Sequence, residues 1–239
     1  MGQEIEVYAS KCVLPAKGSG MEIVLRKYDL VIFDMDGTIL NTLDDLTDSL
    51  NVVLLAHHYP QRTLAEVRSF VGNGIRLLIE RAVPEGLSVE EIDQIHQDFM
   101  NYYEEHCADK TKPYQGVPAL IKTLREQGYR TAVVSNKADQ AVQELCQQYF
   151  PGLFDIAVGE RPGIAKKPAP DSVNQVLQSL NMKREQAVYV GDSEVDVATA
   201  YNAGMDGIAV TWGFRKPDFL KQQGATCLVS DPKEIIDLV

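Results

Sequence analysis

Short apolar runs alternate with amphipathic stretches along most of this 239-residue chain. Runs rich in Val and Ile and bounded by turn residues are typical of strands buried in a parallel sheet. The pattern predicts strands over 28–34, 130–135, 154–158, 187–190, 207–211 and 226–229. It predicts helices between the later strands, over 118–127, 138–149, 171–180 and 195–203. This alternation favours an α/β fold in which crossover helices connect the strands of a parallel sheet.

Residues 42–112 follow a different pattern, in which no strand is predicted. Apolar side chains recur there at helical spacing, as at Leu43, Leu46, Leu50 and Leu54 and again at Ile92, Ile95, Phe99 and Tyr103. Three helix starts have the spacing of a capping box, namely Thr42-x-x-Asp45, Thr63-x-x-Glu66 and Ser88-x-x-Glu91. We therefore predict an all-helical domain over 42–112, inserted into a core domain that comprises 21–41 and 113–239.

The charge of the chain excludes some classes of partner. A net charge of −11 argues against binding to nucleic acid or anionic membranes, since both need a basic surface. No apolar run approaches the roughly 20 residues that span a bilayer. If so acidic a protein binds phosphate, the positive charge must be local, which favours a metal ion and a few lysines.

The four cysteines, Cys12, Cys107, Cys146 and Cys227, are widely scattered and show no metal-ligand spacing. In a chain of this size they are typical of a reduced, cytoplasmic protein. Residues 1–20 lack the basic start and apolar run of a signal peptide. We interpret them as an expression tag or a flexible extension, because 17–20 has the composition of a linker.

A pair of carboxylates follows the first predicted strand. Asp34 and Asp36 are two residues apart, so they lie on one side of an extended chain, and Gly37 allows a sharp turn after them. One carboxylate can attack phosphorus while its neighbour transfers a proton. The stretch is therefore a candidate site for nucleophilic chemistry on phosphate, although the same residues can also simply end a strand and begin a turn.

Three further polar clusters follow later strands, where ligands bind to sheets of this kind. Ser135-Asn136-Lys137 offers a hydroxyl, an amide and backbone N–H groups at a predicted helix start, which suits phosphate. Lys166-Lys167-Pro168 offers positive charge, and Asp192 and Asp196 lie four residues apart on one predicted helical face with oxygens that suit Mg²⁺. Taken singly, a helix cap, a solvated lysine pair and an acidic first turn explain these clusters equally well.

In this order the clusters resemble the motifs of the haloacid dehalogenase superfamily of phosphatases. That family has Asp-x-Asp-Gly-Thr, then Ser or Thr, then Lys-Pro, then Gly-Asp-x-x-x-Asp, and each motif is present here. The resemblance covers nearly the whole chain after Tyr28. It implies a Rossmann-like parallel-sheet core that carries an inserted, mobile helical cap.

The resemblance also implies a role for each matching residue. Asp34 is the expected nucleophile that forms an aspartyl-phosphate, and Asp36 is expected to protonate the leaving oxygen and then to activate water. Mg²⁺ is expected on the Asp34 carboxylate, the Asp36 backbone carbonyl and Asp192, while Asp196 holds a metal-bound water or orients the lysine. That lysine is expected to be Lys167, because it directly precedes the proline. The residues expected to bind the phosphoryl group with it are Gly37, Thr38, Ser135 and Asn136.

The inserted domain contains the residues that indicate a substrate. Residues 70–82 resemble the cap segment of phosphoglycolate phosphatases, and 210–214 resembles a loop of the same enzymes. Gly72-Asn73-Gly74 opens a predicted helix, so its N–H groups can bind a substrate carboxylate, or it is only a turn between two cap helices. After the first motif this chain has Asn41-Thr42, where phosphoglycolate phosphatases commonly have Asp-Ser. A similar Asn-Thr occurs in related pyrophosphatases.

We therefore expect an Mg²⁺-dependent phosphate-monoester hydrolase that acts on a small phosphorylated metabolite, 2-phosphoglycolate first, as a monomer or homodimer. A phosphosugar mutase or a pyrophosphatase of the same superfamily is the main alternative. A phospho-accepting signalling module is a more distant one, because such modules lack a helical insertion and a second Asp two residues after the acceptor.

Overall fold

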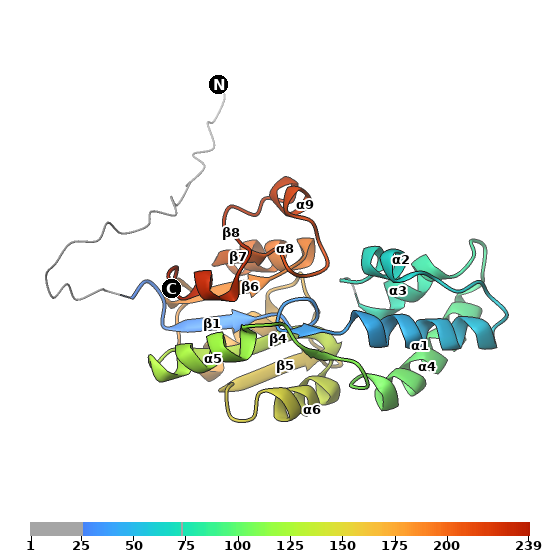
Figure 1. Ribbon diagram of the computed structural model, residues 1–239, viewed down its shortest axis with the longest axis horizontal. Coiled ribbons are helices and arrows are strands. Elements are labelled where there is room, and N and C mark those ends of the chain that lie inside the picture. The colour runs from blue at the N-terminus through green and yellow to red at the C-terminus, as the bar shows by residue number, and fades with distance from the viewer. Residues whose placement is uncertain (1–25, 73) are drawn as a thin grey trace, which may run out of the picture.

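The computed structural model describes residues 26–72 and 74–239, and these residues contain a six-stranded parallel sheet (Figure 1). The strand order is β5–β4–β1–β6–β7–β8, with β1 (Leu30–Phe33) near the middle. The other strands are β4 (Arg130–Ala138), β5 (Ile156–Glu160), β6 (Ala187–Gly191), β7 (Asp206–Val210) and β8 (Leu228–Val229). Each predicted strand is confirmed, and the α/β parallel-sheet fold is confirmed with it.

Helices cover both faces of this sheet. Val31 and Phe33 of β1 pack into one apolar cluster with α5 (Val117–Glu126) and α6 (Asp139–Tyr149). The alternate residues Leu30 and Ile32 pack into a second cluster with α7 (Asp171–Ser179) and α8 (Glu194–Ala203). Side chains that alternate across a strand thus supply both cores, which explains why the strand is apolar throughout. The remaining core helix, α9 (Pro217–Gln222), follows β7.

The inserted segment forms a helical cap with its own apolar core. It comprises α1 (Leu43–Ala56), α2 (Leu64–Phe70), α3 (Ile75–Ala82) and α4 (Val89–His106). Leu50, Ile79 and Phe99 are fully buried within it. No helix in the described part of the chain is long and apolar enough to cross a membrane.

Two of the three predicted capping boxes are present and one is absent. Thr63 and Ser88 cap α2 and α4 as expected. Thr42 makes no side-chain cap at α1, and the Asp45 carboxylate accepts from the N–H groups of Lys110 and Thr111 at 2.9 and 2.8 Å. Asp45 therefore fastens the chain that returns from the cap.

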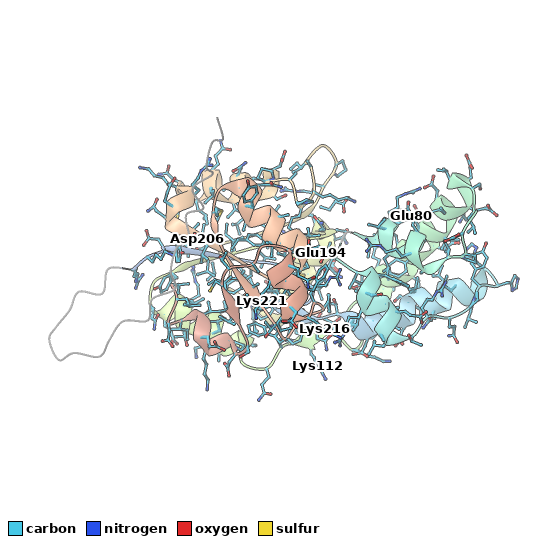
Figure 2. The ribbon with its side chains drawn as sticks, turned by 90° about the horizontal axis from the view of Figure 1, so that it is seen from above. Glu80, Lys112, Glu194, Asp206, Lys216 and Lys221 are labelled. Atoms are coloured by element: carbon cyan, nitrogen blue, oxygen red, sulfur yellow. The ribbon has the colours of Figure 1, made fainter. Side chains whose placement is uncertain are left out.

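Paired linkers connect the cap to the core. β2 (Leu40–Asn41) and β3 (Lys112–Pro113) form an antiparallel pair at the predicted domain junctions. Figure 1 shows the cap next to the carboxyl ends of the central strands. In Figure 2 the cap, which carries Glu80, projects from one end of the core, while Asp206 lies toward the opposite end. The linkers thus place the cap over the edge of the sheet where the polar clusters end.

Candidate active site

The predicted polar clusters meet at the carboxyl ends of β1, β4 and β6. Asp34 directly follows β1, and its N–H donates to the carbonyl of Val190 in β6 at 2.8 Å. Carboxylate oxygens of Asp34, Asp192 and Asp196 lie within 4.8 Å of one another, and all three residues are buried. Because parallel strands end at one edge of the sheet, this geometry gathers side chains from distant parts of the chain.

Lys167 supplies the positive charge at the centre of this acidic cluster. Its Nζ donates to Asp34 Oδ1 at 2.6 Å, to Asp196 Oδ1 at 2.8 Å and to Tyr189 Oη at 3.1 Å. Burial opposes the charge of Lys167, but Asp196 and Asp34 outweigh burial and raise the pKa of the ammonium well above its usual value. Lys167 is therefore charged where it meets the expected nucleophile.

Asn136 does not cap a helix; its side chain instead binds the backbone of Lys167. Its Nδ2 donates to the Lys167 carbonyl at 3.0 Å, and its Oδ1 accepts from the Lys167 N–H at 2.8 Å. The neighbouring Lys166 is half-exposed, and its Nζ lies 3.9 Å from Glu160 on the surface. The contacts of the two lysines therefore favour Lys167 as the cation of the site.

The acidic cluster is short of positive charge. Burial and the charge of Asp196 raise the pKa of Asp34 to about 7, against the opposing effect of Lys167. Burial and the charges of Asp196 and Asp34 raise the pKa of Asp192 well above its usual value. A hard divalent cation held by carboxylate oxygens relieves such repulsion, so the residues present fit Mg²⁺.

Asp196 is engaged on both of its oxygens. Its Oδ1 accepts from Lys167, and its Oδ2 accepts from Ser193 Oγ at 2.6 Å and from the Asp192 N–H at 3.2 Å. These contacts favour an orienting role for Asp196 over contact with a metal-bound water. The prediction that Asp192 and Asp196 share a helical face is wrong, because α8 begins only at Glu194 and Asp192 lies in the preceding loop.

Two glycines make room for Asp192. A Cβ on Gly37, which has a φ of +89°, would lie 2.4 Å from Asp192 Oδ2, and a Cβ on Gly213 would lie equally close to it. Thr38 Oγ1 donates to Asp192 Oδ1 at 3.3 Å, and the Phe214 N–H donates to Oδ2 at 2.7 Å. Gly37 and Thr38 thus shape the metal-ligand side of the site, and their contact with substrate stays a prediction.

The helix predicted over 138–149 is confirmed as α6, but Ser135 and Asn136 lie in β4 and do not cap it. β4 continues to Ala138, which pairs with Glu160 of β5, and α6 begins only at Asp139. The register of β4 against β5 shifts between Val134 and Ala138, and within this irregular stretch the N–H of Lys137 donates to Ser135 Oγ at 3.1 Å. Ser135 and Asn136 nevertheless line the pocket described next.

A pocket of about 60 Å³ lies between core and cap. The core lines it with Asp34, Asp36, Ser135, Asn136, Lys137, Lys167, Asp192, Ser193, Phe214 and Arg215, and the cap with Leu46, Val71, Gly72, Gly74, Ile75 and Leu78. The predicted cap loop therefore reaches the pocket through Gly72 and Gly74, whereas Asn73 lies outside the described residues. Charged groups line one side of this pocket and apolar cap residues the other.

Comparison with known proteins places this arrangement in a family. The model of the haloacid dehalogenase-like hydrolases matches residues 31–210. The chain belongs to this family. The phosphoglycolate phosphatase of Psychrobacter arcticus is 32% identical to it over 216 residues, which cover 87% of this chain and 94% of that protein. The N-acetylmuramic acid 6-phosphate phosphatase of Pseudomonas aeruginosa is 29% identical and covers 87% of this chain and 93% of its own length.

A solved structure extends the likeness to the whole fold. A crystal structure from Lactobacillus delbrueckii subsp. bulgaricus, provisionally named a phosphoglycolate phosphatase, has a TM-score of 0.85 and 39% identity. The match covers 88% of this chain and 97% of that one. This haloacid dehalogenase-like hydrolase is thus an enzyme of the phosphatase group.

Two contacts of this hydrolase with its cap, and one contact within its core, could not be assigned from the sequence. Lys137 is buried, and its Nζ donates to Tyr103 Oη of α4 at 2.6 Å. It also lies 3.6 Å from Asp36 Oδ1. Arg215 donates to the carbonyl of Val71 in the cap at 2.7 Å. The sequence offers one indication of these contacts, which is that Lys137 directly follows Ser135 and Asn136. Its partner Tyr103 occupies an ordinary apolar position of a predicted cap helix, so the sequence does not indicate their contact.

Proposed function

We propose that this hydrolase cleaves phosphate monoesters in an Mg²⁺-dependent reaction that passes through an aspartyl-phosphate on Asp34. The observation that carries the proposal is the 2.6 Å contact between Lys167 Nζ and Asp34 Oδ1 at the base of a pocket also lined by Asp36. A carboxylate and a phosphate repel each other, and a buried ammonium at this position offsets the repulsion.

The residues of the site divide the reaction between them. An oxygen of Asp34 attacks phosphorus, the bond from phosphorus to the ester oxygen breaks, and Asp36 delivers a proton to that oxygen. Asp36 then takes a proton from the water that attacks the aspartyl-phosphate, which releases phosphate and restores Asp34. Lys167 stays oriented by Asp196 throughout.

The proposed metal ligands are the Asp34 carboxylate, the backbone carbonyl of Asp36 and Asp192. When bound, Mg²⁺ supplies positive charge against the phosphoryl oxygens. Gly37 and Gly213 keep Asp192 close to the strand end, so the chain holds the donor oxygens in place before any substrate arrives.

The proposed substrate is 2-phosphoglycolate. The relatives named above include phosphoglycolate phosphatases, and the pocket of about 60 Å³ suits a compact ligand, since one water needs roughly 10–15 Å³ on this measure. Gly72 and Gly74 border the pocket and are the predicted donors of N–H groups to the ligand. The apolar cap side excludes water, which strengthens the charge interactions in the site.

Phosphate release tests this function directly. The panel contains 2-phosphoglycolate, N-acetylmuramic acid 6-phosphate, sugar phosphates, nucleotides and pyrophosphate, each with Mg²⁺ or EDTA, for wild type and Asp34→Asn. We expect Mg²⁺-dependent turnover of 2-phosphoglycolate that disappears in the variant. If wild type hydrolyses only another compound of the panel, the proposed substrate is refuted. If wild type with Mg²⁺ releases phosphate from no compound, hydrolysis is refuted, and an assay for phosphosugar mutase activity follows.

A further inference from the structure

We propose that Lys137 binds a second anionic group of the substrate, a carboxylate close to the ester oxygen, and thereby selects phosphorylated acids. This inference rests on the proposed phosphatase function and names the class of its substrates. Lys137 lines the pocket although only 7% of its surface is exposed. A lysine is rarely buried unless its charge has a partner, so its position requires an explanation.

The ammonium of Lys137 has donors to spare. It carries three N–H groups, and one of them is used on Tyr103 Oη at 2.6 Å. Asp36 Oδ1, at 3.6 Å, lies too far for a hydrogen bond, and this oxygen has no hydrogen-bond partner among the described residues.

The other cations that line the described pocket are committed elsewhere. Lys167 is held between Asp34 and Asp196. Arg215 is bound by Glu194 and by two cap carbonyls. Of these pocket cations, Lys137 therefore has the most N–H groups left to donate to an anionic ligand.

Its place next to Asp36 defines what kind of anion it meets. In the proposed mechanism Asp36 touches the ester oxygen of the leaving group, and Lys137 Nζ lies 3.6 Å from Asp36. A carboxylate only a few bonds from that oxygen falls within reach of the ammonium. The relatives named phosphoglycolate phosphatases act on such an ester, in which the carboxylate adjoins the carbon that bears the ester oxygen.

Tyr103 is a positioning residue that acts through Lys137. It comes from cap helix α4, its ring stacks on Phe99 with centroids 5.2 Å apart, and Lys137 Nζ lies 4.3 Å from the centroid of its ring. The hydroxyl and the ring face together hold the ammonium at the boundary between cap and core. Recognition of the substrate anion is thus linked to the position of the cap.

The test compares 2-phosphoglycolate with ethyl phosphate, in which a methyl group replaces the carboxylate. The measured quantity is the ratio of kcat/KM for the two esters, because an effect on the shared chemistry cancels in it. We expect Lys137→Met to lower this ratio about 10- to 100-fold, the size of a lost hydrogen bond to a charged group. Lys122→Met is the matched control, since Lys122 lies exposed on α5, and it should leave the ratio unchanged.

Two further measurements guard against a variant that folds poorly. Tyr103→Phe keeps the ring and removes the hydroxyl, and it should lower the ratio by a smaller factor, about 3- to 10-fold. Calorimetry on Asp34→Asn should show tighter binding of 2-phosphoglycolate than of ethyl phosphate, and the added Lys137→Met change should abolish that preference.

The outcomes separate this inference from the proposed function. An unchanged ratio in Lys137→Met, with an unchanged binding preference, would overturn the inference and assign the carboxylate to the amides of Gly72 and Gly74. If wild type hydrolyses ethyl phosphate without preferring 2-phosphoglycolate, the hydrolase function stands and the role of Lys137 fails. If wild type hydrolyses no monoester, the proposed function fails, and the calorimetry still decides whether Lys137 binds a carboxylate.

Discussion

Arg215 and Glu194 form a two-point ion pair, with Nε to Oε2 at 2.7 Å and Nη2 to Oε1 at 3.0 Å. The same guanidinium donates to the carbonyls of Arg68 and Val71 at the end of cap helix α2, at 3.0 and 2.7 Å. Figure 2 shows Glu194 on the part of the core that faces the cap. A planar fork held by a carboxylate is well suited to such contacts, so Arg215 fastens the cap to the core.

Replacement of Arg215 by Lys should loosen this fastening, because an ammonium cannot reproduce the fork. We expect KM for the substrate to rise about 10-fold, with faster hydrogen exchange of the amides over 67–78. Arg130→Lys is the control, since Arg130 pairs with Asp155 at the other end of the sheet. Unchanged KM and exchange in Arg215→Lys would contradict a fastening role.

Lys167→Met should abolish most of the activity. The variant leaves Asp34 and Asp196 without their shared ammonium, and we expect kcat to fall about 10²- to 10³-fold or more. Lys166→Met removes the same charge one residue away and should change kcat less than about threefold. Steady-state phosphate release measures both, and equal losses would mean that the two lysines share the role.

Gly37→Ala should disturb Asp192 beyond the strain of its backbone. A Cβ at Gly37 would collide with Asp192, whereas Gly86 has a similar φ of +90° and nothing within 4 Å of its Cβ position. Both variants should lose about 1 kcal/mol to backbone strain, and Gly37→Ala should lose roughly 1–3 kcal/mol more from the clash. Urea unfolding measures the two free energies, and equal losses would show that Asp192 yields freely.

Mg²⁺ should stabilise the folded protein through Asp192. At a concentration about 100 times its Kd, a ligand that binds only the folded state adds about 2.7 kcal/mol to the free energy of unfolding. We expect Mg²⁺ to raise the Tm of wild type and of Asp218→Asn, an exposed control, but to raise that of Asp192→Asn much less. An equal rise in Asp192→Asn would exclude this carboxylate as a ligand.

Asp155 should make the free energy of unfolding depend on pH. It accepts from Arg125, from Arg130 and from the N–H of Thr131. Burial alone would raise the pKa of Asp155, but these donors outweigh burial and lower it. Because the folded-state pKa lies below the unfolded one, the stabilisation is present above about pH 4 and is lost as the pH falls further.

Asp155→Asn should therefore lower the free energy of unfolding by about 1–3 kcal/mol at neutral pH. The difference from wild type should shrink toward zero as the pH falls through the titration of the carboxylate. Urea titrations at pH 7 and pH 3 measure this difference, with Asp218→Asn as the exposed control. A difference that stays constant with pH would indicate a packing effect instead of a charge effect.

The order of elements and the residues of the core motifs could be predicted from the sequence because they depend on local rules. An apolar strand such as Leu30–Phe33 is recognised by its period and its boundaries, and Asp34 and Gly37 follow it within a few positions. The helical insertion was recognisable for the same reason, since spacing along one helix face is a local property.

Tertiary structure decided how the cap meets the site. Lys137 and Tyr103 are 34 positions apart, and Asp45 and Thr111 are 66 positions apart, so no local pattern records that they touch. The extension of β4 to Ala138 likewise depends on pairing with β5, so Ser135 and Asn136 lie in the strand and do not cap α6. By itself the sequence thus indicated the core motifs, with Lys167 as their lysine, whereas only packing between distant segments decided that Lys137 faces the cap and that Arg215 fastens the two domains.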